Sequence, residues 1–343
     1  MDEQGKPRAG LGYSLLSSHR SELMGVAMLW IMLFHCFPLV IPVHFLDAVK
    51  RIGFAGVDIF LLLSAMGLTL SALSRPRRYG SYLVRRSGRI LPAFYIVTVP
   101  FYLWKVLTGR IAVRSALLNL VFLGYFVDAP DHFNWYIPAL LVFYLLAPLM
   151  ILAVAKSGRT RDIVTVCGCV VGVAVSELAA RIGLGHLLDF LYRFPVFWVG
   201  VRLGFAVHED KKLTLPRTLF WLAMLAVGTL YIYYRQFLAF NIAVIYGFIF
   251  TTVPLCLILA LIFDKLPVRP LLWVLRQIGA SSLEIYLINA TWFIEFRFFS
   301  DLLRLPMDVY CLVGLPVNIL LGVALHCAIE AVRKRIGKKA KVK

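Results

Sequence analysis

Long apolar runs separated by short polar segments recur along the whole chain. A membrane-spanning helix requires about 20 consecutive apolar residues, within a range of about 17–25. Ten runs reach that length, at residues 22–44, 54–74, 89–108, 135–155, 162–182, 187–207, 217–235, 240–263, 279–299 and 309–332. The run at 115–127 is too short to span comfortably, and we expect an interfacial or re-entrant helix there. The pattern predicts an all-α polytopic membrane protein of about ten spans.

The distribution of Lys and Arg predicts which loops face the cytoplasm, because cytoplasmic loops carry an excess of these residues. With ten spans, the segments on the side of both termini hold 25 of the 36 Lys and Arg, and those on the other side hold eight. If 115–127 also spanned, the basic C-terminal tail would face outward. We therefore expect both termini in the cytoplasm and the protein in the cell membrane.

A single domain accounts for almost the whole chain. We expect a polar cytoplasmic segment at residues 1–21, one transmembrane domain at residues 22–332, and a basic cytoplasmic tail at residues 333–343. No cleavable signal is expected, because the first apolar run is long and no small-residue cleavage site follows it.

Composition and charge exclude a soluble protein. Apolar residues make up 61% of the chain and charged residues 16%, against about 45–50% and about 25% in ordinary soluble domains. The net charge of +18 could suggest nucleic acid, but the basic residues punctuate apolar runs and form no single face. We expect contacts with anionic membrane lipid and no nucleic-acid partner. The six cysteines show no metal-ligand spacing, so we expect neither a metal site nor a permanently bound cofactor.

Two ionisable side chains, His35 and Asp58, fall inside the first two predicted spans. Both would lie in the outer half of the membrane, on adjacent antiparallel helices. An imidazole can accept and return a proton near neutral pH, and a carboxylate bonded to one ring nitrogen would fix its tautomer. We therefore expect a catalytic dyad. The structural alternatives are a core histidine bonded to another helix and an aspartate favoured by the helix dipole.

Six arginines and no lysine lie between Arg75 and Arg89. Arg86 and Arg89 are three residues apart and would share one face of a helix. A guanidinium can bind phosphate through two parallel hydrogen bonds. The cluster indicates either a phosphate-bearing ligand or a topology anchor.

Further polar residues lie within or at the edges of the spans, where a structural ion pair or the wall of a cavity would explain them. They are Glu177, Arg193, Arg202, Glu284, Asn289, Glu295 and His326. Trp135 and Tyr136 open the fourth span from the outer side. They are explained either by an interfacial aromatic belt or by an acceptor groove.

Five blocks in fixed order carry a resemblance that covers nearly the whole chain. They are RSELMGVAMLWIMLFH (20–35), GFAGVDIFLLLSAMGL (53–68), RRSGRILPAFY (85–95), FNWYIPALLVFYLLAPL (133–149) and IGASSLEIYLIN (278–289). In this order they resemble the acyltransferase-3 family of bacterial integral membrane acyltransferases. The resemblance implies that His35 is the essential histidine of the family, that Asp58 belongs to its second-helix block, and that Arg86 and Arg89 form its RxxR element.

Three positions depart from the family pattern. Met24 stands where an Arg is usual, with Arg20 one helical turn further toward the cytoplasm as its substitute. Ala65 replaces a common glycine, and Asn289 replaces a histidine often found there. The departures suggest a subgroup of the family. No extracellular esterase-like domain is expected after the last helix.

The resemblance implies transfer of an acyl group, most often acetyl, from cytoplasmic acyl-CoA to a hydroxyl of a cell-envelope or exported carbohydrate. His35 would act as the base or as a transient acyl carrier. We expect the donor to bind Arg20, Arg85, Arg86 and Arg89. We expect the acceptor site or cavity to be lined by Trp135, Tyr144, Glu284, Tyr286 and Asn289. The alternative is a transporter or flippase for a lipid-linked saccharide, with His35 and Asp58 as a proton relay.

Overall fold

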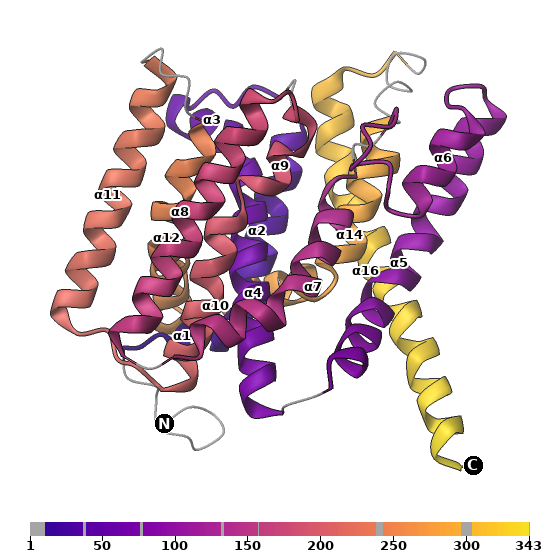
Figure 1. Cartoon of the computed structure of the whole chain (residues 1–343). Coiled ribbons are helices and arrows are strands. Elements are labelled where there is room, and N and C mark those ends of the chain that lie inside the picture. Colours follow the sequence, from indigo (N-terminus) through magenta and orange to yellow (C-terminus); the bar gives the residue numbers. More distant parts are fainter. Residues whose placement is uncertain are drawn as a thin grey trace.

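The computed structural model describes residues 11–36, 39–75, 78–131, 134–156, 158–237, 243–295 and 304–342. Within these ranges the chain forms helices and no strand, which confirms the all-α prediction (Figure 1). The helices are α1 (Ser14–Ser18), α2 (Arg20–His35), α3 (His44–Arg51), η1 (Gly53–Ala55), α4 (Gly56–Ser74), α5 (Tyr79–Leu107), α6 (Val113–Leu120), α7 (Tyr136–Val154), α8 (Arg159–Arg181), η2 (Gly185–Leu187), α9 (Leu188–Leu191), α10 (Phe194–His208), α11 (Leu215–Phe237), η3 (Val244–Tyr246), α12 (Gly247–Lys265), α13 (Arg269–Ala280), α14 (Ser282–Ile288), η4 (Asn289–Phe293) and α16 (Met307–Val342).

Eight helices of the described chain are long and apolar enough to cross a membrane. They are Gly53–Ser74, Tyr79–Leu107, Tyr136–Val154, Arg159–Arg181, Gly185–His208, Leu215–Arg235, Val244–Lys265 and Met307–Ile336. Helix α13 together with α14 and η4 has the length and hydropathy of a ninth span, and the bend of 66° between them is the geometry of a broken span or of a re-entrant loop. Each of the nine corresponds to one of the expected runs, although the span expected at 279–299 begins earlier, at Arg269.

The prediction of a first span over residues 22–44 is wrong in its C-terminal end, because the helix there ends at His35. Helix α2 ends at His35 after 16 residues, a length of about 24 Å, and α3 begins separately at His44. The sequence between them contains Pro38 and Pro42. Proline lacks the backbone N–H that a helix needs, and it disfavours helical geometry in the preceding residue. The short helix expected within 115–127 is α6, which has eight residues and does not span.

Two helix pairs approach closely because glycine removes a side chain at the contact. Helix α2 packs on α13, where a Cβ atom at Gly279 would lie 1.8 Å from the carbonyl oxygen of Ser21. Helix α4 packs along α10, where a Cβ atom at Gly200 would lie 2.5 Å from the carbonyl oxygen of Leu62. The contacts hold α2 and α4 at the centre of the bundle, between α10 on one side and α13 on the other.

The two ends of the bundle differ in charge. In Figure 1, α1, the start of α5 and the last turns of α16 lie at the lower end, and α3 and α6 lie at the upper end. The lower end carries Arg86 and Arg89 on α5 and Arg333 on α16. Arg333 Nη2 donates to the carbonyl oxygens of Gly88 and Arg89, at 2.7 and 3.1 Å. We call this lower end the basic end.

Candidate active site

An arginine-lined cavity of about 100 Å³ lies between α2, α4, α5, α7 and α14. Its polar lining consists of Arg20, Ser64, Arg86, Arg89, Tyr136, Tyr144, Ser282 and Tyr286. The structure therefore brings three of the four arginines expected to bind the donor together with two residues expected to line the site. Arg85 is exposed and does not line this cavity, so it is not grouped with the other three.

Arg20 lines the cavity together with Met24, the position at which the family pattern has an Arg. Arg20 Nε donates to the carbonyl oxygen of Leu63 at 3.1 Å, and its guanidinium lies over Gly67, where a Cβ atom would be 3.3 Å away. Met24 lines the same cavity. Arg20 thus supplies a cation to the cavity from the preceding helical turn. Ala65, the second departure, lies away from the cavity, where its Cβ packs against Gly200.

Arg86 presents an unsatisfied donor at the cavity. Its side chain is half-buried, its Cζ lies 5.8 Å from the centre of the Tyr82 ring, and its Nε has no hydrogen-bond partner. Buried polar groups are nearly always hydrogen-bonded. An anionic group entering the cavity would satisfy this nitrogen.

His35 contacts Asn289, the position at which the family often has a histidine. Nδ1 of the imidazole donates to the amide oxygen of Asn289, which is fully buried at the start of η4. The segment η4 is π-helical, a geometry that is frequent at functional sites. Tyr286, at the wall of the arginine-lined cavity, lies three residues before Asn289, or about 4.5 Å along the helix. On α14 the last lining residue therefore lies about one helical turn before Asn289, whereas on α2 it is Met24, eleven residues and about 16 Å before His35.

Asp58 does not make the hydrogen bond to His35 that the sequence led us to expect. Its carboxylate is fully buried, and neither oxygen has a hydrogen-bond partner. Its ion-pair partner is Arg193, with Nε of Arg193 3.8 Å from Oδ2. Arg193 directly precedes α10, the helix that packs along α4, and this packing brings it to Asp58. The expected dyad is corrected to two separate pairs, His35 with Asn289 and Asp58 with Arg193.

Trp135 belongs to the second pair. The guanidinium carbon of Arg193 lies 4.6 Å from the centre of the Trp135 ring, within the range of a cation–π contact. Arg193 is only 1% exposed, and its side chain also donates to the carbonyl oxygen of Asp189. The sequence indicated a structural ion pair or the wall of a cavity for Arg193, but it did not connect Arg193 with Asp58 or Trp135.

Glu284 contacts neither the His35–Asn289 pair nor the Asp58–Arg193 pair, and its partner is His326. Nδ1 of His326 lies 3.1 Å from Oε1 of Glu284, and the pair joins α14 to α16. The structure thus places Glu284 in a contact between two helices, and Glu284 does not line the arginine-lined cavity.

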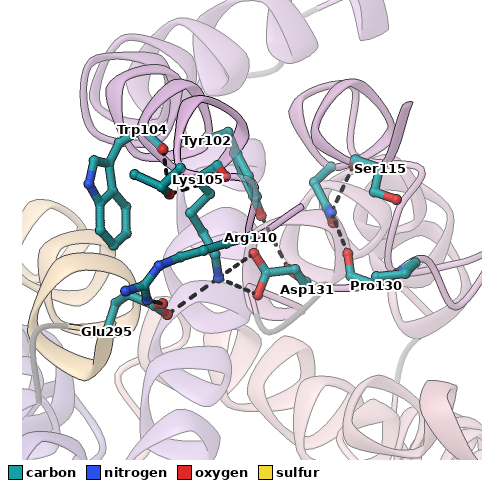
Figure 2. Close-up of polar contacts among 10 residues, drawn as sticks. Tyr102, Trp104, Lys105, Arg110, Ser115, Pro130, Asp131 and Glu295 are labelled. Atoms are coloured by element: carbon teal, nitrogen blue, oxygen red, sulfur yellow. Dashed lines mark hydrogen bonds and ion pairs between the residues drawn. The ribbon is translucent and has the colours of Figure 1, made fainter. Parts of the chain in front are cut away.

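A charged cluster at the end of the bundle opposite the basic end holds the segment after η4 (Figure 2). Lys105 is 5% exposed, and its Nζ lies 2.8 Å from the carboxylate of Asp131 and 3.3 Å from that of Glu295. Arg110 also donates to Glu295, at 2.8 Å. A buried ammonium is stable only when carboxylates compensate it. The cluster therefore ties α5 and the segment at Asp131 to the chain just beyond η4, the segment that carries Asn289.

No metal ligand set accompanies these groups. Across the described ranges of the chain, no group of three or more His, Cys, Asp or Glu side chains is placed to hold a metal ion.

Comparison with known proteins identifies the family. Residues 23–329 match the acyltransferase-3 family model, described as an acyltransferase domain. No significant match was found to a curated protein or to a solved structure. The matched region contains His35, Asp58, Arg86 and Arg89, and it covers nearly the whole chain. The chain belongs to the acyltransferase-3 family of membrane acyltransferases.

Proposed function

We propose that this membrane acyltransferase transfers an acyl group from cytoplasmic acyl-CoA to a hydroxyl of a cell-envelope or exported carbohydrate. In this proposal the basic end faces the cytoplasm of the cell, as the excess of Lys and Arg on that side favours. The observation that carries the proposal is the arginine-lined cavity between α2 and α14, the two helices that lead to His35 and Asn289.

The donor would enter from the basic end. Arg20, Arg86 and Arg89 would bind its phosphates, since guanidinium groups match phosphate oxygens in charge and geometry. Arg20 and His35 are fifteen residues apart on α2, a rise of about 22 Å. The long pantetheine arm of acyl-CoA suits such a passage. The cavity of about 100 Å³ holds only part of the coenzyme, so we expect the adenosine portion to remain outside it.

His35 would handle the proton of the reaction. Because Nδ1 donates to Asn289, Nε2 is the basic nitrogen of the ring. As the acceptor oxygen attacks the thioester carbonyl carbon, Nε2 takes the hydroxyl proton, a C–O bond forms and the C–S bond breaks. The proton then passes to the departing thiolate, which leaves as free CoA. In the second form of the mechanism His35 carries the acyl group between two such transfers, and trapping an acyl-enzyme distinguishes the two forms.

The acceptor would approach the buried pair of Asp58 and Arg193. Both oxygens of Asp58 and Nε of Arg193 lack hydrogen-bond partners, and sugar hydroxyls can both donate and accept hydrogen bonds. The Trp135 ring beside them offers an apolar face to a sugar. The rival interpretation, a transporter with a His35–Asp58 proton relay, loses its main support because these two side chains do not bond to each other.

The proposal is tested with the purified protein in lipid nanodiscs. We expect the release of free CoA from acyl-CoA to accelerate when an extract of envelope glycans is added, together with a new acyl increment on the glycan by mass spectrometry. A protein that transports a glycan but leaves both acyl-CoA and the glycan unmodified would instead support the rival.

A further inference from the structure

A second cavity, of about 690 Å³, lies between α5, α16 and the segment formed by α14 and η4. Its lining is almost entirely apolar, with Ile96 and Val97 from α5 and Val313, Val317 and Leu321 from α16. All of these except Val97 are exposed, so the cavity is open on one side. The volume is within the range of about 300–1,000 Å³ that is typical of ligand sites. The role proposed above for the arginine-lined cavity does not use this space.

One amide interrupts the apolar lining. Asn318 lines the cavity, its side chain is only 2% exposed, and neither Nδ2 nor Oδ1 has a hydrogen-bond partner. An unsatisfied buried amide is costly, and buried polar groups nearly always find a partner. A ligand of this cavity is therefore expected to be largely hydrocarbon and to carry one hydrogen-bonding group that meets Asn318.

The packing of α16 on α14 and η4 puts Asn318 at the level of the proposed chemistry. A Cβ atom at Gly314 would lie 2.3 Å from the Phe293 ring, and one at Gly322 would lie 2.4 Å from Ile285. The two helices are antiparallel, so Gly314 faces Phe293 and Gly322 faces Ile285. Asn318 lies midway between the two glycines, and position 289 lies midway between Phe293 and Ile285. Asn318 is therefore level with position 289. Asn289 is the partner of His35.

The distance to the basic end agrees with this placement. Arg333, which bonds to the carbonyl oxygen of Arg89, lies fifteen residues after Asn318, or about 22 Å along α16. The same number of residues separates Arg20 from His35 on α2. On the other side of Asn318 the cavity continues past Val313 to Val309, nine residues and about 13 Å away.

We propose that this second cavity holds the hydrocarbon chain of the donor's acyl group, with Nδ2 of Asn318 donating a hydrogen bond to the acyl carbonyl oxygen. This rests on the proposed function. It replaces acetyl, the acyl group that the family resemblance favours, by a medium-length or longer aliphatic acyl group, because an acetyl group would leave most of the volume empty. A bilayer lipid fits less well, since its ester carbonyls lie near the membrane surface. Asn318 lies eleven residues, about 16 Å, below the first residue of α16.

The experiment measures binding of CoA, acetyl-CoA and octanoyl-CoA to the full-length protein in phosphatidylethanolamine–phosphatidylglycerol nanodiscs. Octanoyl-CoA is expected to bind at least tenfold more tightly than acetyl-CoA, because each buried methylene adds affinity. Val317→Trp, which fills the cavity, should weaken octanoyl-CoA binding at least tenfold and leave CoA binding unchanged. The matched control is Leu230→Trp, at an exposed apolar position of α11, which should change neither.

Asn318→Leu provides a second variant that does not depend on the bulky Trp being accommodated. Removal of an unpartnered amide should leave folding intact, as judged by monodisperse elution, and should weaken both acyl-CoA esters several-fold while sparing CoA. Equal affinities for acetyl-CoA and octanoyl-CoA would overturn the inference, as would a phospholipid retained in native mass spectrometry that octanoyl-CoA does not displace. If CoA itself fails to bind, the proposed function is overturned, and the inference with it.

Discussion

His35 and Asn289, 254 positions apart in the chain, meet at the junction of α2 with the π-helical segment η4. The contact orients the imidazole through its Nδ1, and in the proposed function it leaves Nε2 to take the proton. In many catalytic histidines a carboxylate has this orienting role, whereas here an uncharged amide has it. An amide fixes the tautomer, but it stabilises the protonated ring less than a carboxylate would.

Replacement of Asn289 is therefore expected to change proton transfer while leaving donor binding unaltered. Asn289→Ala should lower kcat about tenfold to a hundredfold, a range typical of partners that orient a functional histidine, with little change in KM for acyl-CoA. Asn289→Asp should move the acidic limb of the pH–rate profile, where the imidazole becomes protonated, to higher pH. The reason is that a carboxylate stabilises the imidazolium. Thr291→Val is the matched control, since the Thr291 hydroxyl bonds only within its own helix, to the Leu287 carbonyl oxygen. A uniform loss in all three variants would contradict a positioning role.

Arg86 and Arg89 are expected to act on the donor alone. Replacing both with Gln should raise KM for acyl-CoA by about a hundredfold or more, since each charge-assisted hydrogen bond contributes about 1.5–3 kcal/mol and about 1.4 kcal/mol is a tenfold change. Arg85→Gln provides the control, because Arg85 is on the same helix but is exposed and outside the cavity. Steady-state kinetics with varied acyl-CoA measure the effect. Equal changes in the double variant and in Arg85→Gln would point to a topology anchor.

Arg193 is expected to support the fold through Asp58. Arg193→Met leaves a fully buried carboxylate uncompensated, which costs about 3–5 kcal/mol when one partner of a buried pair is removed. Asp58→Asn in the same chain should recover much of that loss, because it removes the uncompensated charge. Thermal unfolding of the four proteins in detergent gives the double-mutant cycle. Additive losses would show that the two side chains are not coupled.

Glu209, in the turn after α10, is expected to make the folded state less stable as the pH falls into the acid range. The hydrogen bond from Arg161 is the main cause that lowers the pKa of Glu209 below its ordinary value of 4.5. A lowered folded-state pKa gives stabilisation that is present above pH 4.5 and is lost as the pH falls through the folded-state value. Between pH 6 and pH 3, the thermal unfolding temperature should therefore fall less steeply with decreasing pH in Glu209→Gln than in the parent protein. Identical slopes would contradict the assignment.

Hydropathy predicted the spans well because a bilayer leaves few alternatives to apolar helices. It failed where local backbone chemistry ends a helix inside an apolar run, as it does after His35, where Pro38 and Pro42 follow in the sequence. The bend between α13 and α14 was not predicted either, because the polar stretch around it, RQIGASSLE (276–284), has the composition expected at the start of a span.

The sequence indicates which ionisable residues lie at membrane depth, but not how they pair. An ionisable side chain at membrane depth is unusual, and this singles out His35 and Asp58 as candidates. Their partners depend on how each helix is rotated about its axis, which apolar runs do not determine. Rotation brings Arg193 to Asp58 and Asn289 to His35, and it separates Arg86 from the exposed Arg85.

The most direct test of the central claim compares envelope glycans from cells that express the wild-type protein, His35→Ala or His44→Ala at equal membrane levels. His44 is an exposed histidine at the start of α3 and serves as the matched control. Mass spectrometry should find the acyl increment in wild type and in His44→Ala, and should find it reduced about a hundredfold or more in His35→Ala, as expected when a general base is removed. An undiminished acyl increment in the His35→Ala cells would contradict the account.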